Sequence, residues 1–147
     1  MLLTSAHDES YPAASPDGRW MAYQSDESGR PEIYIRPLEG AASRRQVSRD
    51  GGISPVWARS GRELFFQSAA GDSLYAARLD TDHDGALLGL DALFALRQGN
   101  SGFDVLPGDS LFVLPEPTGP GAERGLPVVV VHNFVAELEA RLGRPTK

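Results

Sequence analysis

A turn followed by a strand is encoded in Pro12-Ala13-Ala14-Ser15-Pro16-Asp17-Gly18-Arg19-Trp20-Met21-Ala22-Tyr23-Gln24-Ser25. The chain repeats this pattern 43 residues later (55 minus 12), as Pro55-Val56-Trp57-Ala58-Arg59-Ser60-Gly61-Arg62-Glu63-Leu64-Phe65-Phe66-Gln67-Ser68. A third and more divergent copy begins near Phe103. A period of roughly 40 to 50 residues is typical of repeat architectures, chiefly propeller blades and helical pairs.

The local signals within each repeat favour propeller blades. Residues 15–18 carry the types preferred at each position of a type I turn, and residues 20–25 have apolar side chains on both parities, as a strand covered on both faces does. Ile33 and Ile35 alternate with polar or aromatic residues. We expect a polar connection at 7–10 and outer strands at 46–48 and 92–96. Helical pairs would need ten-residue stretches of 3.6-residue period, which the sequence lacks.

These signals predict an all-β fold, a partial β-propeller of about three four-stranded antiparallel blades with a short C-terminal α-helix. The single domain spans 1–147, with repeats at 12–54, 55–102 and 103–132 and the helix at 133–143. We expect a partial ring because closed propellers typically have 4 to 8 blades. Four consecutive valines, Val128 to Val131, predict a buried strand in the third repeat, and the helix is expected to cover a face or edge of the last blade.

Charge and composition exclude several classes of function. The formal net charge is −6, whereas a nucleic-acid surface needs clustered Lys and Arg, so no nucleic-acid partner is predicted. The chain has no cysteine, so it forms neither a disulfide nor a thiolate metal site. No apolar run approaches the 18 or so residues that a membrane span requires.

One segment has the spacing of a calcium-binding loop. Asp80, Asp82 and Asp84 alternate before Gly85, and Asp91 occupies the twelfth position, where the last ligand of such a loop would lie. The alternative is an acidic hairpin loop between the outer strands of a blade. A calcium loop usually ends in a bidentate Glu and lies between helices, so the sequence leaves both interpretations open.

The chain is predicted not to be an enzyme and to hold no organic cofactor. Residues 99–103 miss the Gly-x-Ser-x-Gly pattern of a serine hydrolase at its last position. The glycine-rich run at 119–125 precedes a strand rather than a helix, so it does not fit a dinucleotide site. The aromatic residues of the inner strands, which are Trp20, Trp57, Tyr23 and Phe66, are expected in the core rather than on a binding face.

The motif of residues 12–29, followed by Glu32-Ile33-Tyr34-Ile35-Arg36-Pro37, resembles the blade motif of TolB-type propeller repeats, the PD variety of WD-like repeat. It is also similar to the C-terminal propeller of many bacterial Ser/Thr protein kinases. The resemblance implies a non-catalytic module that recognises a protein or small ligand, in an extracytoplasmic or periplasmic compartment. Two features depart from it: residues 58–61 read Ala-Arg-Ser-Gly where the family has Ser-Pro-Asp-Gly, and no kinase motif is present.

Two alternatives to this recognition module stay open at the level of sequence. One is the propeller gate of a prolyl-oligopeptidase-type serine peptidase, without its catalytic domain. The other is a structural fragment that closes a ring by homo-oligomerisation, since three blades leave sheet faces and edges without partners.

Overall fold

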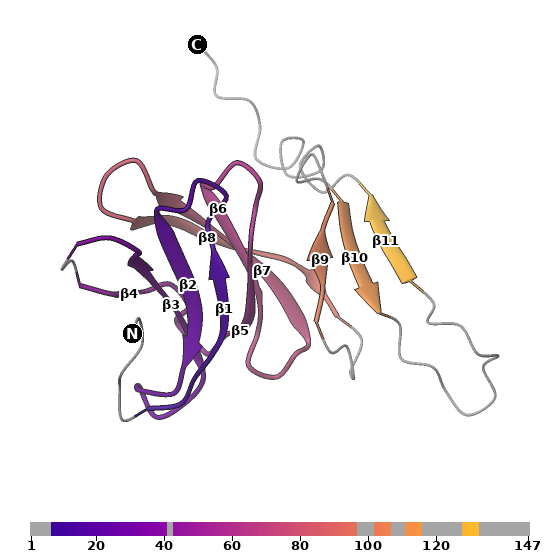
Figure 1. The fold of residues 1–147 in the computed structure, drawn as a ribbon. Helices are drawn as coiled ribbons and strands as arrows, with labels where there is room; N and C mark the ends of the chain where they lie inside the picture. Colours follow the sequence, from indigo (N-terminus) through magenta and orange to yellow (C-terminus); the bar gives the residue numbers. More distant parts are fainter. Residues whose placement is uncertain (1–6, 41–42, 97–101, 107–110, 116–127, 133–147) are drawn as a thin grey trace, which may run out of the picture.

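The computed structural model describes residues 7–40, 43–96, 102–106, 111–115 and 128–132. All regular elements in these ranges are strands, and they form three antiparallel sheets that follow one another along the chain (Figure 1). No helix in these ranges is long and apolar enough to cross a membrane. The all-β prediction is therefore confirmed, whereas the helix predicted at 133–143 lies outside the described residues.

The strands pair in the order in which they occur in the sequence. The first sheet contains β1 (Glu9–Ala14), β2 (Trp20–Ser25), β3 (Glu32–Pro37) and β4 (Arg45–Gln46). The second contains β5 (Ile53–Trp57), β6 (Glu63–Gln67), β7 (Ser73–Asp80) and β8 (Ala86–Ala95). The third contains β9 (Asp104–Val105), β10 (Leu111–Pro115) and β11 (Val128–His132). Two four-stranded meanders and a third described with three strands match the predicted blades.

The 43-residue repeat is visible in the backbone of the first two sheets. β1 has a bulge between Ser10 and Ala13, and β5 has one between Ile53 and Val56. Within these bulges, Tyr11 has φ 52° and Ser54 has φ 55°, two left-handed conformations 43 residues apart (54 minus 11). Side chains other than glycine rarely adopt this conformation. The same irregularity thus occurs at the same position of both sheets, immediately before a proline.

The predicted β1–β2 turn is confirmed, and its divergent copy keeps the same geometry. The Gly18 amide donates to the Ser15 carbonyl at 2.9 Å, and the Gly61 amide donates to the Ala58 carbonyl at 3.0 Å. The two glycines have φ 71° and 68°. Glycine is the residue that the left-handed position requires. The second repeat has Arg59 and Ser60 where the first has Pro16 and Asp17. The turn therefore keeps its geometry without this proline and this aspartate.

Two apolar cores lie between successive sheets, as expected of stacked blades. Side chains of the first and second sheets meet in one cluster. Its buried members are Trp20, Ala22, Ile33, Ile35, Val47, Trp57, Leu64, Phe66, Ala77 and Leu79. The second and third sheets meet around Phe112, whose ring lies edge-on to Phe65 at 4.9 Å between centroids. Tyr23 packs with Met21 and Tyr34 on the opposite face of the first sheet. The predicted core placement of the four aromatic residues is confirmed.

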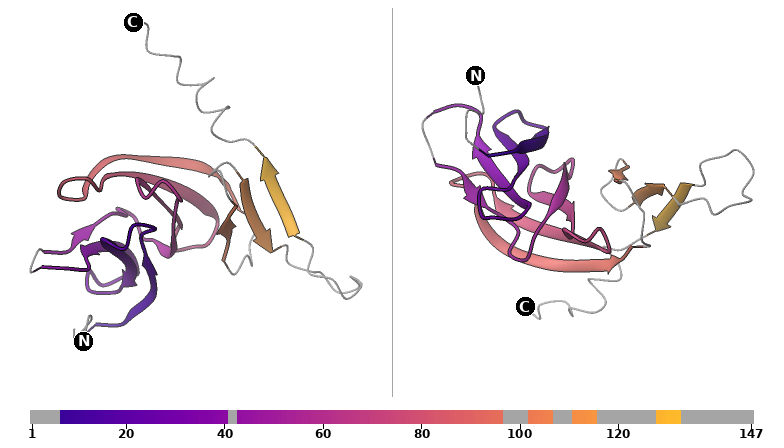
Figure 2. Two further views of the ribbon diagram at one scale, coloured as in Figure 1. Left: turned by 45° about the horizontal axis from the view of Figure 1, so that its top comes forward. Right: turned by 90° about the horizontal axis from the view of Figure 1, so that it is seen from below.

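Three predicted element boundaries are wrong. Glu9 and Ser10 belong to β1 rather than to a connection. They pair with β2 before the bulge, just as Ala13 and Ala14 pair with β2 after it. The outer strand of the first sheet is only Arg45–Gln46. The outer strand of the second sheet starts at Ala86, six residues before the predicted start at Ala92, because the turn at residues 80–85 reverses the chain directly after β7. Figure 2 shows β8 as a long, curved strand along the outside of the second sheet. The repeat boundaries 12–54, 55–102 and 103–132 stay predictions.

Candidate functional site

The segment predicted as a calcium loop is a tight hairpin between β7 and β8. The Gly85 amide donates to the Asp80 carbonyl at 2.8 Å, which closes the turn over residues 80–85. Asp91 lies within β8, opposite Ala76 of β7. Residues 80–85 therefore form an acidic hairpin turn, and Asp91 is separated from it by the first part of β8.

Each of the four aspartates pairs with a different set of basic side chains. Asp82 pairs with Arg19 and Arg62, Asp84 with Arg45, Asp91 with Arg78, and Asp80 with His83. Within the described part of the chain, no three His, Cys, Asp or Glu side chains lie close enough together to hold a metal ion. Calcium binding by Asp80, Asp82, Asp84 and Asp91 stays a prediction, and this geometry does not favour it.

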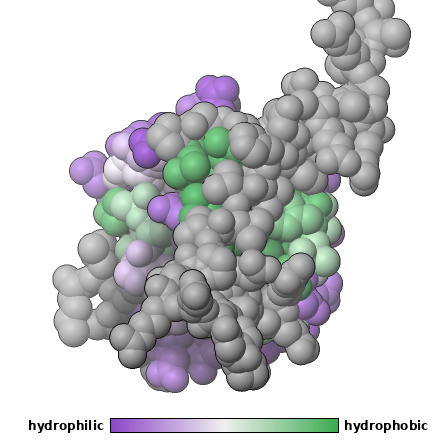
Figure 3. Space-filling view, turned by 90° about the vertical axis from the view of Figure 1, so that its right-hand side faces the viewer, coloured by the Kyte–Doolittle hydropathy of each residue, from purple (hydrophilic) through white to green (hydrophobic). Residues whose placement is uncertain are grey.

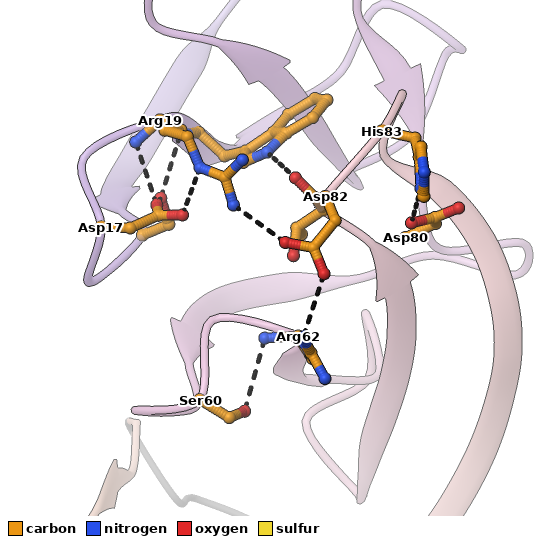
Figure 4. Close-up of polar contacts among 10 residues, drawn as sticks. Asp17, Arg19, Ser60, Arg62, Asp80, Asp82 and His83 are labelled. Atoms are coloured by element: carbon orange, nitrogen blue, oxygen red, sulfur yellow. Dashed lines mark hydrogen bonds and ion pairs between the residues drawn. The ribbon is translucent and has the colours of Figure 1, made fainter.

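Asp82 joins the turns of two successive sheets (Figure 4). Its Oδ1 lies 3.3 Å from Nη2 of Arg19, and its Oδ2 lies 3.0 Å from Nη2 of Arg62. The two arginines occupy equivalent positions of the repeat, 43 residues apart (62 minus 19), each just after the turn glycine. A carboxylate of the second sheet's outer hairpin thus links the β1–β2 turn to the β5–β6 turn.

Asp17 is the most strongly anchored carboxylate of this region. The Ser15 hydroxyl donates to its Oδ1 at 2.5 Å, the Arg19 amide donates to the same oxygen at 3.0 Å, and Nε of Arg19 donates to Oδ2 at 2.6 Å. These hydrogen bonds, with that from Ser15 the largest contribution, lower the pKa of Asp17 from 3.8 to about 2. Asp17 is therefore ionised over the whole physiological pH range and fixes the orientation of Arg19.

Trp20 holds the β7–β8 hairpin against the first sheet. Its indole Nε1 donates to the Thr81 carbonyl at 3.0 Å. The ring lies so close to Gly85 that a Cβ on this glycine would lie 2.6 Å from ring atom Cη2. Because Gly85 also has φ 71°, only glycine fits there without strain. The position of the hairpin relative to the first sheet is therefore set by side-chain packing as well as by ion pairs.

A cleft of about 550 Å³ opens where these segments meet. The β1–β2 turn, the β3–β4 connection and the β7–β8 hairpin form its walls, through Asp17, Gly18, Arg19, Trp20, Pro37, Glu39, Ser43, Arg45, Thr81, His83 and Asp84. Its volume lies within the roughly 300–1,000 Å³ typical of ligand pockets. No sequence pattern predicts this cleft, although Arg19 and Arg62 recur at one position of the repeat and both contact Asp82 beside it.

Two of the three histidines have described side chains, and each lies near an aspartate. His83 contacts Asp80 through Nδ1 at 2.7 Å, but it lies on an exposed hairpin, where its ring is 79% accessible. His7 lies 3.9 Å from Asp26, at the opposite end of β2 from the cleft. Ser101, the serine of the imperfect hydrolase motif, lies outside the described residues. The site offers charged groups and a recess in which a ligand can bind.

Comparison with known proteins identifies TolB-like relatives. The chain is 31% identical over 99 residues to "Protein TolB homolog" from Chlorobium chlorochromatii, a match that covers 65% of this chain and 20% of that protein. No protein-family model matches the chain. The chain thus spans about a fifth of the length of this curated relative, and homology to TolB-like proteins is supported at modest identity.

Two solved structures share the fold. The putative TolB from Agrobacterium tumefaciens matches 66% of this chain and 37% of its own, with a TM-score of 0.50 and 24% identity. TolB from Acinetobacter baumannii matches 84% of this chain and 32% of its own, with a TM-score of 0.55 and 20% identity. These matches confirm the propeller fold. The resemblance to kinase-associated propellers stays a prediction.

Proposed function

We propose that this chain is a non-catalytic β-propeller module that recognises a protein partner through the loops at one end of its first two sheets. The observation that carries the proposal is the cleft between the β1–β2 turn, the β3–β4 connection and the β7–β8 hairpin. Charged side chains line it: Asp82 holds Arg19, and Trp20 fixes the β7–β8 hairpin through the Thr81 carbonyl. Loops that a rigid sheet positions are the usual location of binding residues.

The proposal extends to the parent protein and its compartment. We place the chain in a TolB-like or kinase-associated bacterial protein that works outside the cytoplasm. The 31% identity to a TolB homolog supports the TolB-like assignment over the kinase-associated one. A peptidase gate is not favoured, because the similar proteins of known name or structure are TolB proteins rather than peptidases. Fractionation of cells that carry the tagged native protein tests the compartment: recovery with cytoplasmic marker proteins contradicts this part.

Site-specific photo-crosslinking tests the recognition surface. A photoreactive phenylalanine analogue is placed at Ser43, which is exposed and lines the cleft. The control position is Asp50, which is exposed in the β4–β5 connection and does not line the cleft. In cells of the source organism, we expect ultraviolet light to yield a discrete heavier adduct from Ser43 and none from Asp50. The partner is then identified by mass spectrometry of the adduct.

Two outcomes would overturn the proposal. No adduct from the Ser43 position, in cells that produce the protein at its native level, contradicts recognition through this cleft. Equal adducts from both positions indicate contacts without site preference, which also contradicts it. An excess of untagged purified chain, added to a lysate before illumination, must abolish the adduct, because specific binding saturates.

A further inference from the structure

We propose that the cleft binds a cationic side chain, that of an arginine or a lysine, which the partner protein presents. This inference rests on the proposed function and specifies the chemistry of the recognised group. It follows from the charges that surround the cleft and from the partners that these charges already have.

The arginines of the cleft have carboxylate partners within the chain. Arg19 contacts Asp17 at 2.6 Å and Asp82 at 3.3 Å. Nη2 of Arg45 lies 2.5 Å from Asp84, and its Nε donates to the backbone carbonyl of the same residue at 2.7 Å. An anionic ligand would have to displace these carboxylates from the guanidinium groups. The existing ion pairs therefore disfavour a phosphate or a carboxylate as the ligand.

Carboxylates exceed guanidinium groups around the cleft. Five carboxylates lie on its walls or in the network behind them, from Asp17, Glu39, Asp80, Asp82 and Asp84. Three arginines oppose them, Arg19, Arg45 and Arg62. His83 adds a positive charge only when it is protonated. Since a cleft focuses the field of the charges that line it, this excess attracts a cation.

Glu39 is the carboxylate of the cleft that a cationic ligand would contact. It lies in the β3–β4 connection, is exposed, and forms no ion pair or hydrogen bond with the described residues. Trp20 and Pro37, which also line the cleft and are paired between β2 and β3, supply apolar atoms against which the carbon chain of a long cationic residue can pack. A carboxylate that has no partner among the described residues, beside an apolar wall, matches the two parts of an arginine or lysine side chain.

The two tryptophans of the chain make the inference measurable. The Trp20 indole N–H lies at the cleft and donates to Thr81, whereas that of Trp57 donates to the Ala13 carbonyl at 3.0 Å, between the first two sheets. In a ¹⁵N-labelled sample, their two indole resonances therefore report on the cleft and on the sheet interface. The probe is the blocked tripeptide acetyl-Gly-Arg-Gly-amide. The matched peptide carries citrulline, which has nearly the same shape as arginine but no charge.

We expect the arginine peptide to shift the Trp20 resonance in a saturable way while that of Trp57 stays in place. The citrulline peptide should produce no saturable shift. Glu39→Gln should weaken binding of the arginine peptide about fivefold, the order expected for one exposed ion pair. Asp50→Asn removes the same charge from a residue outside the cleft, so it should leave the affinity within about twofold.

Three results would overturn the inference. They are an unmoved Trp20 resonance, equal shifts with both peptides, and equal weakening by Glu39→Gln and Asp50→Asn. The last result would mean that the net negative charge of the chain, rather than the cleft, attracts the peptide. Failure here combined with a Ser43 crosslink leaves recognition through the cleft intact and rejects only its cationic chemistry. Failure of the crosslink as well rejects the proposed function.

Discussion

At the scale of single residues, the cleft is organised by carboxylates that accept several hydrogen bonds each. Asp82 contacts Arg19 and Arg62, and Asp17 accepts from Ser15 and from both the backbone and the side chain of Arg19. These groups are partly exposed, so each pair contributes little to stability on its own. Their effect is positional, because shared partners fix the arginines in one arrangement.

His83 provides a direct test of this local electrostatics. The hydrogen bond that the imidazole Nδ1–H donates to the Asp80 carboxylate is the main cause that raises the pKa of His83 above 6.5, and the charges of Asp80, Asp82 and Asp84 add to it. Because its folded-state pKa is the higher one, the contact contributes stability below pH 6.5 and loses it as the pH rises through the folded-state pKa. NMR titration of the imidazole should show a raised pKa, and Asp80→Asn should return it towards 6.5. An unchanged pKa in this variant would contradict the assignment.

Calcium binding by the aspartates of the β7–β8 region can be tested by thermal melting. If Asp80, Asp82, Asp84 and Asp91 bind the ion, millimolar Ca²⁺ raises the thermal melting midpoint, because a ligand that binds the folded state stabilises it. Asp91→Asn should then abolish the rise. Differential scanning fluorimetry with and without Ca²⁺ decides the question, with equal ionic strength in both samples. A midpoint that does not move rejects calcium binding.

At the scale of elements, the β7–β8 hairpin determines the shape of the cleft. It reverses the chain within residues 80–85, packs against Trp20 through Gly85 and presents Asp82 and Asp84 to arginines of the first sheet. β8 then continues for ten residues, with irregular pairing to β7 at two places. The hairpin is therefore both the outer edge of the second sheet and one wall of the cleft.

Gly85→Ala tests whether this packing matters. The added Cβ would lie 2.6 and 2.7 Å from two atoms of the Trp20 ring, in a backbone conformation with φ 71°. We expect a loss of about 2–4 kcal/mol in the free energy of unfolding, from overpacking and backbone strain together. Urea denaturation followed by tryptophan fluorescence measures it.

Gly71→Ala is the matched control for this variant. Gly71 lies in the β6–β7 turn with φ 70°, but a Cβ there would have no heavy atom within 4 Å. It should therefore show only the cost of the backbone conformation, about 1–2 kcal/mol. If the two variants lose equal stability, close packing of Gly85 on Trp20 is not what restricts this position.

At the scale of the whole molecule, the three sheets form part of a propeller whose two ends differ. The first sheet buries Met21, Tyr23 and Tyr34 on the face away from the second sheet. The third sheet is at the other end, and Figure 3, which faces this side, shows hydrophobic residues among the described atoms. Within the described residues, no further sheet packs against either end.

Ring closure by several copies predicts a defined mass in solution. Light scattering coupled to gel filtration should then give an integer multiple of the 15.8 kDa of one chain. The apparent stability would rise with protein concentration, because association favours the folded state. A monomer that unfolds cooperatively at all concentrations would contradict ring closure by homo-oligomerisation, and it would leave recognition through the cleft unaffected.

Features that depend on local backbone geometry follow directly from the amino-acid sequence. The turn at Ser15–Gly18, its copy at Ala58–Gly61 and the two-sided burial of β2 follow from glycine, proline and apolar periodicity over a few residues. The ion pair between Arg19 and Asp82 does not follow from local sequence, because 63 residues separate the two side chains. Only the stacking of the first two sheets brings the two side chains together and creates the cleft. The aspartate spacing that indicated calcium was a local pattern, and Asp80 pairs locally with His83. The partners of Asp82 and Asp84, in contrast, come from other turns and strands and depend on the packing of the sheets.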